Sequence, residues 1–239
     1  MEIKDIEELV RKTVEPIEIN GRKYSAESLS PIITPYPATV TVHNLRGFCD
    51  FIKNDIDKKI KGKPGLIVIN DPKSVELISA LDNEARRTVL ISAHISPKIS
   101  LFPFGSFMEQ EKFVILFRSM FLESADFDYV LNYVSKIVDN TIIEDEDDGI
   151  TQTVTVKKGT SGALKDKATL KPIVSLKPFR SFVEAEQVES EFLLRINKQS
   201  GGTPTIALFE ADGGAWINQA TENVAEYIRR EIVDIPVIA

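Results

Sequence analysis

Residues 66–95 read LIVINDPKSVELISALDNEARRTVLISAHI, and this stretch sets the kind of sheet that the chain can form. Its apolar and β-branched runs predict strands, and Asp71-Pro72 and Asp82-Asn83 predict the turns between them. Parallel pairing needs a crossover of a dozen or more residues, so connections this short indicate an antiparallel meander and disfavour a Rossmann-type sheet. The expected strands are Leu66–Ile69, Val75–Leu81 and Thr88–Ile95.

Further elements are expected on the N-terminal side of the meander. Apolar spacing predicts a helix over residues 2–14, and Asn20-Gly21 is typical of a tight turn between strands 17–19 and 23–24. After a strand over residues 38–43, Asn44 is a residue type that caps helices by accepting a backbone hydrogen bond. The helix after it should bury one apolar stripe. That stripe consists of Leu45, Phe48, Cys49, Ile52 and Ile56.

A central helical pair is expected after the meander. Ser106 and Glu109 have the spacing of a capping box, and the helix that follows is apolar on more than one side. We therefore expect it to be the most buried helix. The second helix starts near Ser124 and repeats apolar residues at helical spacing. Those residues are Phe127, Val130, Leu131, Val134, Ile137 and Val138.

Residues 144–148 are five consecutive acids, which repel one another and resist packing. We expect an acidic linker at 144–149, between an N-terminal α+β module of residues 1–143 and a β-rich C-terminal module of residues 150–239. The predicted fold class is α+β, with two modules of antiparallel β-meanders covered by helices. The C-terminal module should contain strands near 151–157, 173–176, 192–197 and 205–210, a hairpin turn at 199–202 and a final helix over about 218–233.

Composition and charge argue against several classes of function. The chain has 239 residues, a net charge of −7 and a single cysteine. An acidic chain is repelled by phosphate backbones, which disfavours generic duplex DNA binding. One cysteine fits a reducing cytosol. The N-terminus carries charge from its second residue, and no apolar run approaches the roughly 20 residues of a membrane helix, so we expect no secretory signal and no membrane partner.

Catalytic or metal chemistry would have to use Cys49, His43 and His94. The motifs HxH, HExxH and CxxC are all absent, and the position of Cys49 on the apolar stripe favours a core role over a pair with His43. In the acidic run, an EF-hand aligned on Gly149 would have Thr155 where the bidentate carboxylate is needed. A solvated linker and a DNA-mimicking surface are the alternatives for that run. We expect no catalytic residues, no metal and no cofactor.

A basic stretch follows the acids directly. Residues 157–165 read KKGTSGALK, whose amides, hydroxyls and lysines suit a phosphate, although the glycine spacing is not that of a P-loop. A lysine-decorated β-hairpin is the alternative. From 157 to 180 there are seven lysines and arginines against one aspartate. The candidate ligand- or partner-binding residues are Lys157, Lys158, Gly159, Thr160, Ser161, Gly162, Lys165, Lys167, Lys171, Lys177 and Arg180.

Four glutamates come after this stretch. Glu184, Glu186, Glu189 and Glu191 favour a solvated face over an acid–base pair for glycoside hydrolysis.

Three segments resemble one family. They are Thr39–Leu45 with Phe48 and Phe51-Ile52, Ser96-Pro97 followed by Met108–Phe113, and Glu191–Ile196. In order and spacing they resemble the YfdQ-like proteins of phages and prophages, a family of unknown function. The resemblance brings no catalytic residues to carry over. It implies a phage-encoded protein that acts in the cytoplasm of a bacterial host.

We therefore expect a phage or prophage binding protein, homo-oligomeric and non-enzymatic. Besides a second copy, its partner would be a host or defence protein or a nucleotide signal. Self-association of the basic stretch with the acidic run of a second copy would explain both charge blocks. The alternative is a single-stranded nucleic-acid accessory protein that uses the basic residues 157–180, and a hydrolase is the third hypothesis.

Overall fold

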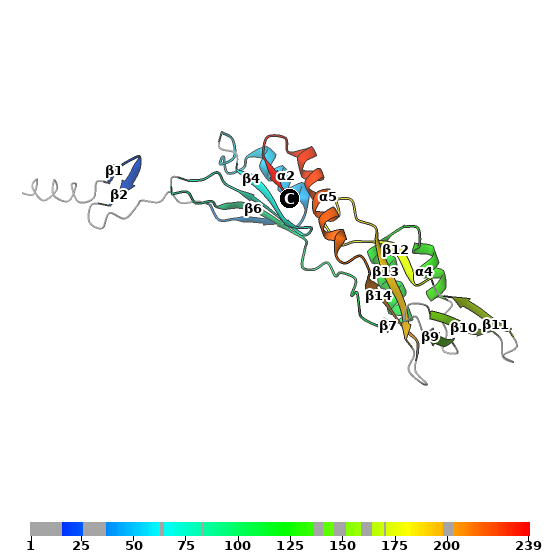
Figure 1. Cartoon of the computed structure of the whole chain (residues 1–239). Helices are drawn as coiled ribbons and strands as arrows, with labels where there is room; N and C mark the ends of the chain where they lie inside the picture. Colours follow the sequence, from blue (N-terminus) through cyan, green and yellow to red (C-terminus); the bar gives the residue numbers. More distant parts are fainter. Residues whose placement is uncertain are drawn as a thin grey trace, which may run out of the picture.

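The computed structural model describes residues 16–25, 37–62, 65–82, 84–135, 141–145, 152–158, 164–169, 171–197 and 203–239, and it confirms the α+β class (Figure 1). The first sheet has the strand order β15 (Val237–Ile238), β4 (Leu66–Asp71), β5 (Ser74–Ile78), β6 (Val89–His94) and β3 (Val40–Val42). The second sheet has the order β7 (Met108–Glu109), β14 (Thr205–Glu210), β13 (Ser190–Asn197), β12 (Ile173–Pro178) and β8 (Phe121–Leu122). The third sheet contains β11 (Leu164–Thr169), β10 (Gln152–Lys158) and β9 (Thr141–Asp145).

The predicted meander forms the centre of the first sheet. Strands β4, β5 and β6 pair antiparallel in sequence order. The carboxylate of Asp71 accepts a hydrogen bond from the amide of Lys73 at 2.6 Å, and Asp82 closes the second turn by accepting from the amides of Glu84 and Arg86. Local aspartate turns therefore fix the connections, as their side chains predict.

Both edges of the first sheet differ from the prediction because they are parallel. β3 lies beside β6, and β15 lies beside β4. Parallel neighbours need long connections, and the helices α2 (Leu45–Asn54) and α5 (Ala215–Glu231) lie in the segments that provide them. β15 has two residues, too few for an alternating pattern to reveal it in the sequence.

Helix α2 begins and packs as predicted. Asn44 Oδ1 accepts a hydrogen bond from the amide of Gly47 at 2.6 Å, and the stripe residues from Leu45 to Ile52 are buried. Ile56 is instead 62% exposed. The helix ends at Asn54 because Asp55 adopts φ 43° and its carboxylate accepts hydrogen bonds from three amides at residues 59–61.

The helix after residue 109 departs from the prediction. α3 (Gln110–Met120) begins after Glu109, which makes no capping hydrogen bond and belongs to β7 together with Met108. The capping box was therefore wrong, since pairing of β7 with β14 takes up this segment. α3 is not the most buried helix, because Ile115 is 60% exposed and α2 buries half of its residues. α4 (Phe127–Val134) follows the predicted stripe up to Val134.

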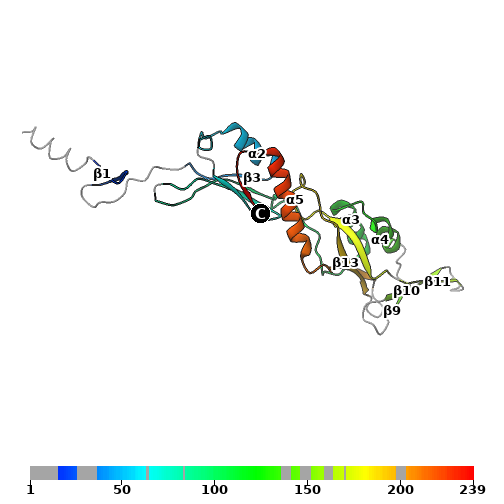
Figure 2. The same cartoon turned by 45° about the horizontal axis from the view of Figure 1, so that its top comes forward.

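The structure has two separate hydrophobic cores, and each contains residues from both sides of the predicted boundary at 144–149. α2 and α5 pack on the first sheet, and α3 and α4 pack on the second. The C-terminal segment thus completes the first core, while residues 102–134 complete the second. An amphipathic pattern does not say which sheet a helix will cover, so the division could not come from local patterns. In Figures 1 and 2, α5 extends from the second sheet to the first.

The N-terminal hairpin, the third sheet and the acidic run were also predicted from local sequence. The Asn20-Gly21 turn joins β1 (Ile17–Ile19) to β2 (Arg22–Tyr24), with both turn residues at positive φ as a type I′ turn requires. β10 and β11 pair antiparallel, and residues 159–163 between them lie outside the described residues. Of the acidic run, Glu144 and Asp145 belong to β9. The predicted helix over 2–14, the turn at 199–202 and residues 146–149, 137 and 138 lie outside the described residues.

The Asn44 cap gives a direct test of helix α2. Replacing Asn44 with Ala removes the acceptor for the Gly47 amide and should lower the free energy of unfolding by about 1 kcal/mol. Asn44→Asp keeps an acceptor oxygen and is the control. Urea denaturation of the two variants checks this, and equal losses for both would contradict the capping role.

Candidate functional site

The predicted basic residues do not form one cluster. Lys157 and Lys158 lie in β10, and Lys165 and Lys167 lie in β11. The register sets Lys157 opposite Lys165 and Thr155 opposite Lys167, so three of these lysine positions share one face of the third sheet. Gly159, Thr160, Ser161 and Gly162 lie outside the described residues.

The remaining three predicted residues are each paired with an acid. Lys171 Nζ lies 2.7 Å from Asp126 Oδ2, and Lys177 Nζ lies 3.2 Å from Glu186 Oε1. Arg180 Nη1 lies 2.7 Å from Glu210 Oε1. Burial alone would raise the pKa of Asp126, but the hydrogen bonds from Lys171 and the Ser175 amide outweigh it and lower that pKa. These partners neutralise the second half of the predicted basic stretch.

Arg180 is the most completely enclosed cation of this set. Its side chain is 6% exposed. Besides Glu210, the guanidinium donates to the hydroxyl of Ser190 and lies 4.0 Å from the ring centroid of Trp216 in α5. Burial lowers the pKa of Arg180 and the Glu210 carboxylate raises it, and an arginine stays charged through such a change.

The loop that carries Arg180 is closed by Gln187. Its Oε1 accepts from the amides of Arg180 and Ser181 at 3.0 and 3.2 Å, and its Nε2 donates to the carbonyls of Phe182 and Ala185. Phe182 and Ala185 belong to the first core, although the loop connects two strands of the second sheet. We call Arg180, Gln187, Glu210 and Trp216 the Arg180 junction. It is a link between the two cores, and its polar groups are already occupied.

Arg180 was predicted as a binding residue, but its predicted neighbours were not the residues that it contacts. Sequence reasoning placed Arg180 with the lysines on charge alone, and it took the glutamates after Phe182 as a solvated face. Glu186 and Glu189 are exposed, and they contact Lys177 and Ser175 respectively. The signals that pointed to the junction were a lone tryptophan after Gly213-Gly214 and a glutamine among the glutamates.

Cys49 and the histidines do not come together as a nucleophile and base. The thiol belongs to the first core at 2% exposure, and burial raises the pKa of Cys49 from 9.0 to about 11. His43 Nδ1 lies 3.1 Å from the carbonyl oxygen of His94, where β3 and β6 run side by side. The structural interpretation of Cys49 is confirmed, since a neutral buried thiol is a poor nucleophile.

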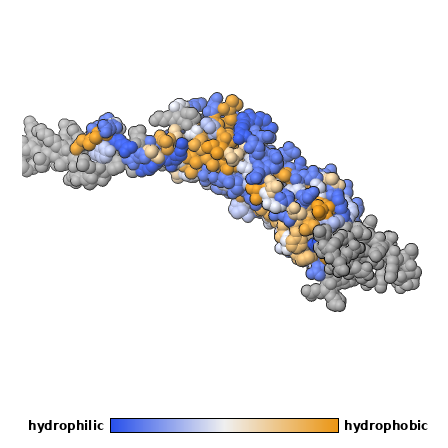
Figure 3. All heavy atoms as spheres, in the orientation of Figure 1, coloured by the Kyte–Doolittle hydropathy of each residue, from blue (hydrophilic) through white to orange (hydrophobic). Residues whose placement is uncertain are grey.

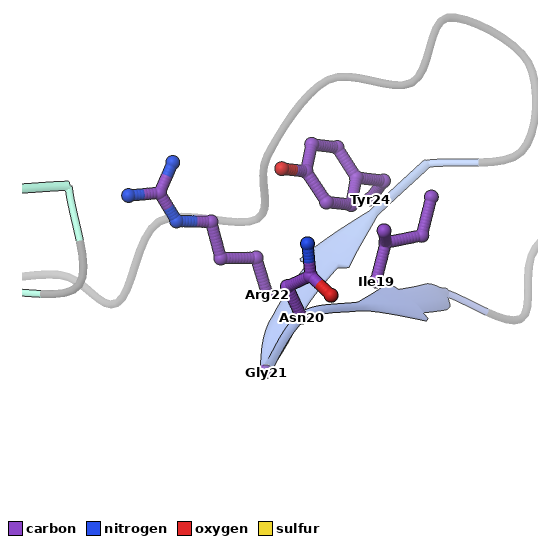
Figure 4. A pocket seen from close by; sticks show the side chains of 5 residues that line it. All are labelled: Ile19, Asn20, Gly21, Arg22 and Tyr24. Atoms are coloured by element: carbon purple, nitrogen blue, oxygen red, sulfur yellow. The ribbon is translucent and has the colours of Figure 1, made fainter.

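Hollows on the described surface include one at the N-terminal hairpin and one beside β8. One, of about 470 Å³, is lined by Ile19, Asn20, Gly21, Arg22 and Tyr24, all from the β1–β2 hairpin (Figure 4). The other, of about 580 Å³, lies beside β8 and combines residues from four segments of the second sheet and its helices. It is lined by Arg118, Phe121, Leu122, Glu123, Phe127 and Lys177. A hollow built by a single hairpin offers few convergent groups, so the β8 hollow is the stronger candidate site.

Within the described ranges, no three His, Cys, Asp or Glu side chains gather in a way that would hold a metal ion. Of the helices described, none is long and apolar enough to cross a bilayer. Comparisons with protein-family models, with curated proteins and with solved structures found no match to this chain.

The junction predicts an asymmetry between its two charges. Glu210→Ala leaves the buried Arg180 guanidinium without its anion and should lower the free energy of unfolding by about 2 kcal/mol, because the carboxylate is 39% exposed and water partly replaces it. Adding Arg180→Met removes the unpaired charge, so the double variant should be more stable than Glu210→Ala alone. Glu231→Ala, which breaks the exposed pair with Lys53, is the control and should change stability much less. The free energies of unfolding are measured by chemical denaturation. A double variant that is less stable than Glu210→Ala would contradict this account.

The Cys49 thiol predicts a loss of stability at high pH. Its pKa is higher in the folded state, so the unfolded chain releases the proton first. The contribution of the neutral Cys49 thiol to the free energy of unfolding is complete below pH 9 and is lost as the pH rises from about 9 to about 11. The difference in unfolding free energy between wild type and Cys49→Ala, measured across this range, should shrink. A constant difference would show that the thiol is not held neutral.

Proposed function

We propose that this chain is a non-enzymatic binding protein encoded by a phage or prophage, and that it works as a homo-oligomer in the cytoplasm of the bacterial host. The resemblance to YfdQ-like proteins supports the origin. The core position of Cys49 and the contact of His43 with a backbone carbonyl support binding over hydrolysis. Half-buried and exposed apolar residues around the first sheet and its helices support a protein partner, either a second copy or a host or defence protein (Figure 3).

One observation supports self-association above all: the third sheet separates charge along its length. The acidic Glu144 and Asp145 pair with Thr153 and Gln152 at one end of β10. Lys157 and Lys158 lie at the other end, six residues away, which is about 20 Å for a strand. That distance exceeds the screening length of about 8 Å at physiological salt, so the two ends present separate fields of opposite sign.

One face of the same sheet has both apolar and charged positions. Alternation puts Ile143, Val154, Val156 and Ala168 on this face, and the register adds Asp145 at one end and Lys158 at the other, with Asp166 opposite Val156. The sheet pairs with no strand of the other described sheets, and a small sheet needs a packed apolar face to be stable.

A second copy fits this face by symmetry. Two such sheets related by a two-fold axis across the strands would bring position 145 of each copy near position 158 of the other, so opposite charges would meet at both ends. A two-fold interface is self-complementary, which is the commonest arrangement for a homodimer. The oppositely charged ends then set the antiparallel orientation of the two sheets.

Charge swaps test this dimer. Lys158→Glu should shift the protein towards monomer at low salt, because each copy would then oppose Asp145 of its neighbour with a like charge. Lys158→Glu combined with Asp145→Lys should restore the dimer. Lys157→Glu is the matched control, because position 157 lies on the other face. Light scattering from low to molar salt gives the mass, and a wild-type mass that neither salt nor Lys158→Glu changes would contradict the proposal.

A single-stranded nucleic-acid accessory role is the second candidate, and the opposite face of the third sheet favours it. Lys157, Lys165 and Lys167 share that face with threonine positions. Binding of a labelled oligonucleotide would fall steeply with salt and would be lost in Lys157→Glu but kept in Lys158→Glu. The two variants therefore separate nucleic-acid binding from dimer formation.

A further inference from the structure

The β8 hollow lies where four elements meet. Arg118 belongs to the last turn of α3, the chain passes directly into β8, and Phe127 is the first residue of α4. Lys177 joins from β12, because the register sets it opposite Leu122. At about 580 Å³ the hollow has the size of small-molecule sites, which run from roughly 300 to 1,000 Å³. All of its lining residues except Glu123 belong to helices or strands.

Two cations face a single acid in this hollow. Arg118 is exposed, and its guanidinium makes no ion pair or hydrogen bond with another residue in the described part of the chain. Lys177 is 24% exposed and pairs with Glu186, whose side chain is 77% exposed. A carboxylate in this much water is held weakly, so another anion can replace it on Lys177. Glu123 is the one carboxylate in the lining. The hollow therefore favours an anionic group, with a planar guanidinium fork suited to phosphate.

Part of the lining is apolar, and ring packing supports it. The ring of Phe127 stacks on Phe117 with centroids 5.1 Å apart and planes 20° apart, and Phe117 is fully buried. Leu122 is 37% exposed beside it. A half-exposed ring on a rigid support is a stacking surface for a flat ligand, since a nucleobase gains about 1–3 kcal/mol by stacking on an aromatic side chain.

We infer that the β8 hollow binds a mononucleotide, with the phosphate on Arg118 and Lys177 and the base against Phe127 and Leu122. The carboxylate of Glu123 is then the acceptor for a base amino group or a ribose hydroxyl. The site differs from the glycine and lysine stretch at 157–165, and it uses only Lys177 of the residues that the sequence singled out. It also does not depend on self-association, because none of its residues lies in the third sheet.

Isothermal titration calorimetry of the full chain tests the inference with AMP, ATP, GTP and UTP, with inorganic phosphate and with an eight-residue oligonucleotide as comparison ligands. At least one nucleotide should bind, and Arg118→Ala should weaken it about ten- to a hundredfold, as expected for loss of a charge-assisted hydrogen bond. Phe127→Leu should weaken the nucleotide and leave phosphate unchanged. Lys112→Ala, an exposed lysine on α3 outside the hollow, should have no effect.

Several results would overturn the assignment. They are absence of binding by every nucleotide at millimolar concentration, equal affinity for nucleotide and inorganic phosphate, or full affinity in Arg118→Ala. Binding of the oligonucleotide without any mononucleotide, with loss in Arg118→Ala, would assign the hollow to nucleic acid instead. Lys158→Glu should keep nucleotide affinity, so failure of the dimer and failure of this site are separate outcomes.

Discussion

The ion pair between Arg180 and Glu210, with Trp216 against the guanidinium, is the contact on which the arrangement of the two cores depends. A buried cation without an anion is strongly unfavourable, so the loop and β14 must stay together once Arg180 is enclosed. Trp216 begins α5, whose later residues Val224 and Ile228 fill the first core. The same loop inserts Phe182 there. One charge thus ties a strand of the second sheet to the helix that completes the first.

The two proposed binding surfaces lie away from this junction. The third sheet and the β8 hollow both adjoin the second sheet in the chain, and neither uses a residue of the junction. Lysine and arginine therefore have two roles in this protein. Arg180 and Lys171 are held by acids and stabilise the structure, whereas Arg118 and the hairpin lysines are the charges on which binding is proposed to rest.

Local chemistry predicted much of the fold. The Asn44 cap, the aspartate turns of the meander, the core position of Cys49 and the Asn20-Gly21 turn all depend on residues a few positions apart. What sequence reasoning missed depends on distant partners. Arg180 lies 30 residues from Glu210 and Lys171 lies 45 from Asp126, so charge along the chain could not show that they were paired. The hollow that brings Arg118 and Lys177 together could not be predicted for the same reason, because the two residues are far apart in the sequence.

Where local and distant preferences competed, the distant ones prevailed. The Ser106–Glu109 spacing favours a capped helix, yet pairing of Met108 with Ile206 made this segment an edge strand. β15 forms because Val237 and Ile238 pair with β4. Helix α5 covers the first sheet, although in the sequence it follows strands of the second sheet. Amphipathic patterns specify that a face is buried, and the partner is chosen by the packing of the whole chain.

Hydrogen exchange of the Glu210→Ala variant, followed by mass spectrometry, tests most directly whether the Arg180 junction couples the two cores. The account predicts faster exchange in the loop at 179–187, along α5 and in strands β4 and β15 of the first sheet. Faster exchange confined to β12, β13 and β14, with α5 and the first sheet unchanged, would contradict it.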